Sequence, residues 1–136
     1  MQKEFFIFTG KLKLGMILDN LRTKKESAFM NISGMARGYM AKHFRAEDFL
    51  IHVSKMVERQ LQEWNNNYQV IIMKLDKYEW NVKIDDVYYT IDLTEDEINE
   101  LKERDPYALD RKLWKDLQSQ GLEILKGYGN YIDFVI

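Results

Sequence analysis

The chain has 136 residues, no cysteine, and 20 Lys and Arg against 22 Asp and Glu. This length is enough for a single domain over residues 1–136 with its own core, and the lack of cysteine excludes disulfides and thiolate metal sites. The charge is split along the chain: the N-terminal half, 1–60, is basic with 11 Lys and Arg against 6 acids, and the C-terminal half, 61–136, is acidic with 9 against 16.

The first predicted element is a strand, because residues 5–8 (FFIF) form a short apolar run that Gly10 ends. Residues 14–21 are ambiguous, since their leucine and isoleucine residues have helical spacing but Gly15 weakens a helix by about 1 kcal/mol relative to Ala. The sequence has neither a secretory signal nor a stretch near the roughly 20 apolar residues of a membrane span. We therefore expect a cytoplasmic protein.

A long amphipathic helix is predicted over residues 46–64. Its apolar residues recur every three or four positions, and Glu47 and Asp48 place negative charge in the first turn, where the helix dipole favours it. Three asparagines, 65–67, end the helix. Its solvent-exposed face should carry Ser54, Glu58, Arg59 and Gln62.

The pattern changes to strands after residue 68. Residues 70–72 predict one strand, and the alternation over 78–84 and 87–93 predicts two more, joined by a tight turn at Asp85 and Asp86. Thr94 and Glu97 have the spacing of a capping box and start a helix, while Asp105 followed by proline starts a second helix that ends at Gly121. Residues 122–125 and 131–136, around the turn residues 127–130, predict a closing hairpin.

These elements predict an α+β fold. A mostly antiparallel sheet from the C-terminal half should pack against the long amphipathic helix over 46–64 and the helix pair after Thr94. The order of two helices and a closing hairpin also matches the last part of a winged helix, so a divergent winged-helix regulator is an alternative. The acidic charge beside its would-be recognition helix opposes that alternative.

The sequence contains no catalytic motif. His43 and His52 are nine residues apart, which would place them on opposite sides of one helix, and the serines lack a GxSxG elbow. No glycine-rich run has the form of a P-loop or a dinucleotide-binding loop. We therefore predict no enzymatic activity, no metal and no cofactor. A metal-independent nuclease with His43 as its acid–base residue is the enzymatic alternative.

A basic segment, residues 11–45, supports a nucleic-acid-binding alternative. Its cations could neutralise phosphates, and Tyr39 or Phe44 could stack on a base. Methionines at positions 30, 35 and 40 would equally suit a pliable protein-binding groove. The candidate phosphate contacts are Lys11, Lys13, Arg22, Lys24, Lys25, Arg37, Lys42 and Arg45.

The leading prediction is a non-enzymatic protein-binding module of a regulatory, inhibitory or immunity type. Two oppositely charged halves and aromatic residues such as Tyr88 and Tyr128 suit an interface. A basic or nucleic-acid-binding protein is one candidate partner, and a homo-oligomer held by opposite charges is another; no membrane is expected. The candidate contacts, which we call the acidic face, are Asp96, Glu97, Glu100 and Glu103.

Overall fold

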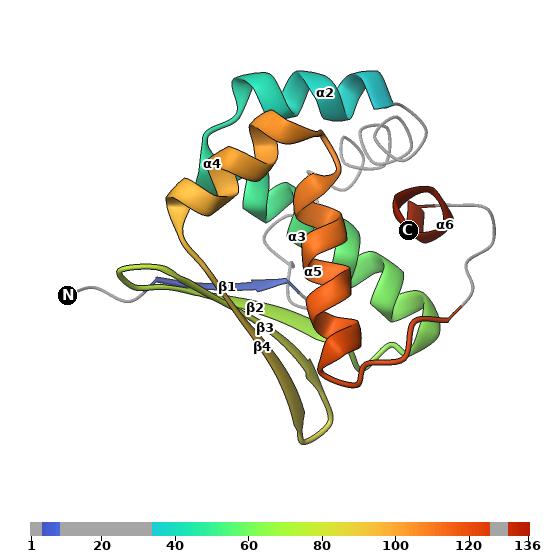
Figure 1. The fold of residues 1–136 in the computed structure, drawn as a ribbon. Coiled ribbons are helices and arrows are strands. Elements are labelled where there is room, and N and C mark those ends of the chain that lie inside the picture. Colours follow the sequence, from blue (N-terminus) through green and yellow to red (C-terminus); the bar gives the residue numbers. More distant parts are fainter. Residues whose placement is uncertain (1–3, 9–33, 126–130) are drawn as a thin grey trace, which may run out of the picture.

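The computed structural model describes residues 4–8, 34–125 and 131–136, and these form an α+β fold. Figure 1 shows the described helices on one side of an antiparallel sheet, and α3 and α5 contact its strands. The strands are β1 (Glu4–Phe8), β2 (Gln69–Lys74), β3 (Tyr78–Ile84) and β4 (Val87–Leu93), and the helices are α2 (Gly34–His43), α3 (Ala46–Trp64), α4 (Glu95–Arg104), α5 (Ala108–Ser119) and α6 (Tyr131–Val135).

The sheet has the strand order β1-β2-β3-β4, and every neighbouring pair is antiparallel. Its register aligns Ile72, Trp80 and Ile91 in one buried row that faces the helices. The strands predicted over 5–8, 70–72, 78–84 and 87–93 are confirmed. The tight turn between β3 and β4 is also confirmed, with Asp85 at φ 52° in the left-handed region that Asp tolerates better than most residues.

The helix predicted over 46–64 is α3, and its apolar stripe forms the centre of the core. The prediction that Ser54 and Glu58 lie in solvent is wrong, because both are buried. The Ser54 hydroxyl donates to the Leu50 carbonyl at 2.6 Å and accepts from Trp80 Nε1 at 2.9 Å. Glu58 Oε2 accepts from the Val70 amide at 2.9 Å. Burial of these polar groups is possible because each is hydrogen-bonded, and the two bonds to β2 and β3 tie the helix to the sheet.

We expect Ser54→Ala to lower the free energy of unfolding by about 1–3 kcal/mol, because it leaves the buried Trp80 Nε1–H without an acceptor. Urea denaturation monitored by tryptophan fluorescence measures this loss. The matched control is Ser119→Ala, which removes an exposed hydroxyl bonded to the Asp116 carbonyl and should change stability by less than about 0.5 kcal/mol. Equal effects of the two substitutions would contradict the bridging role of Ser54.

Local signals account for the ends of the helices. Thr94 caps α4 as predicted, since its Oγ1 accepts from the Glu97 amide at 3.1 Å. Asp105 accepts from the Tyr107 amide at 2.7 Å through Oδ1, but regular helix begins only at Ala108. Gly121 ends α5 with φ 103° in a Schellman turn, in which the Leu122 amide donates to the Leu117 carbonyl at 3.0 Å.

The predicted closing hairpin is wrong, because residues 131–135 form the short helix α6. Tyr131, Ile132 and Val135 are buried at positions i, i+1 and i+4, a helical spacing that the segment 131–136 is too short to reveal. The winged-helix alternative required this hairpin as its wing, and residues 131–135 form a helix instead. Residues 14–21, 127–130 and Tyr128 lie outside the described residues. Among the described helices, none has both the length and the apolar character needed to cross a membrane.

Candidate functional site

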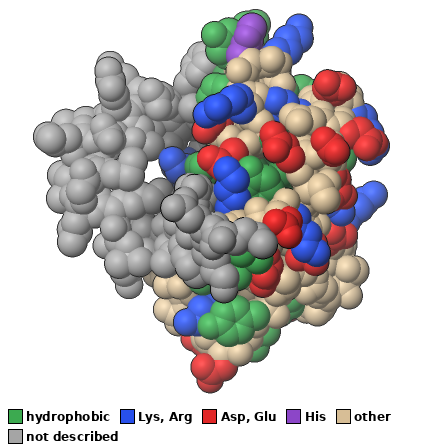
Figure 2. Space-filling view, turned by 90° about the vertical axis from the view of Figure 1, so that its left-hand side faces the viewer, with side chains coloured by type: hydrophobic (Ala, Val, Ile, Leu, Met, Phe, Trp, Pro, Cys, Tyr) green, Lys and Arg blue, Asp and Glu red, His purple; other side chains and the backbone are tan. Residues whose placement is uncertain are grey.

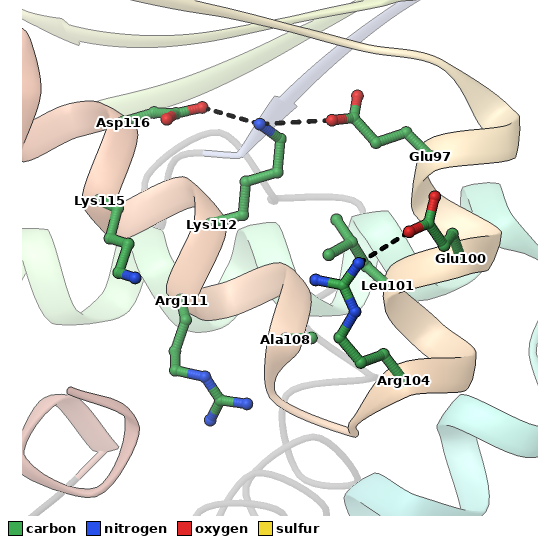
Figure 3. A pocket seen from close by; sticks show the side chains of 9 residues that line it. All are labelled: Glu97, Glu100, Leu101, Arg104, Ala108, Arg111, Lys112, Lys115 and Asp116. Carbon is green, nitrogen blue, oxygen red and sulfur yellow. Dashed lines mark hydrogen bonds and ion pairs between the residues drawn. The ribbon is translucent and has the colours of Figure 1, made fainter.

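A cavity of about 410 Å³ lies between α4 and α5 (Figure 3). Lys112 Nζ lies between two carboxylates, at 3.1 Å from Asp116 and 3.3 Å from Glu97, and Arg104 binds Glu100 at 2.7 Å. Lys112 of α5 therefore faces Glu97 of α4 across the cavity, whereas Arg104 and Glu100 both belong to α4. The residues that line this α4–α5 cavity are Glu97, Glu100, Leu101, Arg104, Ala108, Arg111, Lys112, Lys115 and Asp116.

The two carboxylates beside Lys112 stabilise its positive charge in the α4–α5 cavity. Burial lowers the pKa of Lys112, but the hydrogen bond and charge of Asp116, with Glu97, outweigh burial and leave this pKa above its usual value. The Lys112 amine is consequently held as a cation. No group of three metal-ligating side chains occurs in the part of the chain that the structure describes.

The acidic face divides into two parts. Glu97 and Glu100 point into the α4–α5 cavity, where cations neutralise them, whereas Asp96 and Glu103 are exposed and pair with no described residue. Figure 2 views the molecule from the side of α4 and shows Asp and Glu gathered at the upper right with Lys and Arg among them. The net negative charge of this surface is therefore smaller than the sequence count implies.

Arg37 cannot contact a nucleic acid in this structure, because it is 2% exposed and forms a bidentate ion pair with the buried Asp110. Burial opposes the guanidinium charge, but the attraction of Asp110 outweighs burial, so the pKa of Arg37 is raised. Lys42 and Arg45 are exposed, which a phosphate contact requires. The other candidates, Lys11, Lys13, Arg22, Lys24 and Lys25, lie outside the described residues.

The two histidines have different surroundings. His43 is exposed at the end of α2, where its ring lies 4.3 Å from that of Tyr39. His52 lies on α3, and its Nε2 is buried without a hydrogen-bond partner among the described residues. The two histidines thus lie on different helices, α2 and α3.

An apolar groove of about 470 Å³, which the sequence did not reveal, lies between α5 and α6. Phe134 and Ile136 are 69% and 65% exposed beside it. Arg111 and Lys115 of α5 border both this groove and the α4–α5 cavity, so they form a basic ridge between two hollows. The residues that line the α5–α6 groove are Arg111, Trp114, Lys115, Gln118, Ile124, Phe134, Val135 and Ile136.

Buried polar contacts hold α6 in the position that forms the groove. The Tyr131 hydroxyl donates to Asp110 Oδ2 at 2.5 Å and accepts from Trp114 Nε1 at 3.1 Å, and the Ile132 amide donates to Gln60 Oε1 at 3.3 Å. Burial raises the pKa of Tyr131 well above its usual value, so the hydroxyl stays protonated and remains a donor. The groove is thus preformed in the folded chain.

Comparison of the chain with protein-family models, with curated proteins and with solved structures found no significant match.

Proposed function

We propose that this protein is a non-enzymatic binding module of a regulatory, inhibitory or immunity type, and that it binds another protein in the α5–α6 groove. The observation that carries the proposal is the exposure of Phe134 and Ile136 beside an open apolar hollow. Exposed apolar side chains that gather at a concave surface mark protein interaction sites, and aromatic residues and arginine are enriched in such interfaces.

The basic ridge indicates the charge of the partner. Lys115 is exposed and pairs with no described residue, while Arg111 is held 3.0 Å from Asp105 at a half-exposed site. A partner with acidic residues beside its apolar contacts would complement both lysine and arginine. We therefore infer that the groove binds an acidic segment whose apolar residues enter the hollow.

The ion pairs of the α4–α5 cavity also support the proposal. In the α4–α5 cavity, Glu97 and Asp116 contact Lys112, and Glu100 contacts Arg104. Carboxylates in such pairs are poorly placed to act as general bases or as ligands of a divalent cation. The cavity thus favours a structural contact between α4 and α5 over catalysis.

A photo-crosslinking amino acid at position 134 or 136 should form a discrete adduct with the partner in the cells that produce the protein. The matched control is the same amino acid at position 35, because Met35 is also strongly exposed but lies on α2. Adding Lys115→Glu should reduce the adduct at position 134 several-fold, since it reverses the charge beside the groove. Adducts of equal strength at positions 35 and 134 would contradict binding in the groove.

The acidic face is the second candidate surface, favoured by the exposure of Asp96 and Glu103. The same experiment separates the two surfaces, because Asp96→Lys with Glu103→Lys reverses two exposed charges without removing an ion pair of the α4–α5 cavity. If an adduct forms with the photo-crosslinking amino acid at position 99 of α4 and not at position 134, and this double substitution abolishes it, the partner is basic and binds on α4.

A further inference from the structure

The edge of β4 is occupied at its midpoint by a side chain. β4 is the last strand in the order of the described sheet, and Thr90 is the central residue of its seven. Gln120 Oε1 accepts from the Thr90 amide at 3.1 Å, and Gln120 Nε2 donates to the Thr90 carbonyl at 2.8 Å. A carboxamide carries the same donor and acceptor as a peptide unit, so Gln120 occupies the place of one residue of a fifth strand.

The end of α5 holds Gln120 in place. The Gln120 amide donates to the Asp116 carbonyl at 3.1 Å, and the Schellman turn at Gly121 fixes the backbone that follows. The side chain therefore reaches Thr90 from a rigid position. Contact with an edge strand in this way blocks the pairing with another chain that unprotected strand edges invite.

Without Gln120, the β4 edge would be self-complementary. The pleat turns the amide and carbonyl of Tyr88 and Asp92 to the same edge as those of Thr90, because alternate residues of an antiparallel strand share one hydrogen-bonding side. A second β4 arranged antiparallel about a two-fold axis at Thr90 would pair Thr90 with Thr90, and Tyr88 with Asp92. Tyr88 is 58% exposed, and no like charges face each other in this register.

We propose that the β4 edge is a strand-addition surface for a second copy of this chain, and that Gln120 keeps it closed. The inference is independent of the α5–α6 groove, because neither Gln120 nor Thr90 lines that groove. Opening of the edge requires the loss of only two exposed hydrogen bonds. The surface can consequently be exposed by one substitution without altering the core.

Light scattering coupled to size-exclusion chromatography tests the proposal on the full chain. The native protein should be a monomer with respect to this edge, and Gln120→Ala should form a dimer whose fraction rises with concentration. Ser119→Ala is the matched control, because Ser119 is exposed at the same end of α5 and lines neither the α4–α5 cavity nor the α5–α6 groove. It should leave the association state unchanged.

A pair of charge variants separates strand pairing from unspecific aggregation. In the Gln120→Ala background, Tyr88→Asp would place a carboxylate opposite Asp92 twice in the dimer, whereas Tyr88→Lys would place a cation there. Like charges directly opposite destabilise a strand pair, so the dissociation constant should be roughly tenfold higher for Tyr88→Asp than for Tyr88→Lys. Equal dissociation constants would overturn the proposed register.

Amide exchange at Thr90 makes a monomeric Gln120→Ala variant informative as well. If that variant stays monomeric and its Thr90 amide exchanges rapidly, the edge is open and does not add a strand, which overturns the proposal. If it stays monomeric with Thr90 still protected, Gln120 is not what closes the edge, which also overturns it. Support requires dimerisation together with protection of the Thr90 amide.

Discussion

Asp110→Ala should lower the free energy of unfolding by about 3–5 kcal/mol, because it leaves the buried guanidinium of Arg37 without its counter-ion. The carboxylate contacts Arg37 of α2 and Tyr131 of α6 together, so its loss should loosen both helices from α5. Urea denaturation provides the free energy. Amide exchange at Ile132 should rise before global unfolding, since α6 is the shorter of the two helices.

A double-mutant cycle distinguishes an unpaired charge from lost packing. Arg37→Met should cost about as much as Asp110→Ala, because burial then opposes an isolated carboxylate; burial already raises the pKa of Asp110 against the charge and hydrogen bonds of Arg37. Combining the two substitutions should cost clearly less than the sum of both, because no buried charge remains. Additive costs would show that the pair contributes only packing.

Most secondary structure was predictable because its signals are local. The apolar spacing of α3, with acids in its first turn and asparagines after its last, places both ends at the residues that the structure shows. Thr94 and Gly121 likewise mark helix ends through hydrogen bonds to residues within five positions. α6 escaped prediction because five residues are too few for period two and period 3.6 to be told apart.

The surfaces were less predictable because they depend on distant residues. Arg37 and Asp110 are 73 positions apart, so a linear count assigns Arg37 to a basic patch and Asp110 to an acidic one, although each neutralises the other. Glu97 and Lys112 likewise neutralise each other across the α4–α5 cavity. The α5–α6 groove could not be predicted without knowing where α6 packs. That position depends on the hydrogen bond from Tyr131 to Asp110. Periodicity predicts that a side chain is buried, but it does not predict which distant side chain will contact it.

The stability of the protein should fall as the pH decreases from 7 to 4, and His52 should account for about 3 kcal/mol of this fall. Burial, assisted by the charges of Arg37, Lys55 and Arg59, lowers the pKa of His52 from 6.5 to about 3. Below pH 6.5 the unfolded chain binds a proton at this residue, whereas the folded chain stays neutral there until about pH 3. Protonation thus favours the unfolded state throughout the interval.

The difference between the native protein and His52→Gln isolates this contribution, because both contain the same carboxylates. Plotted against pH, the free energy of unfolding should decrease less steeply for His52→Gln, by up to about 1.4 kcal/mol per pH unit below pH 6. The matched control is His43→Gln, which replaces the exposed ring on α2 and shows whether loss of any histidine changes the slope. If His52→Gln shows the native slope as well, His52 is protonated in the folded protein and its Nε2 has access to solvent.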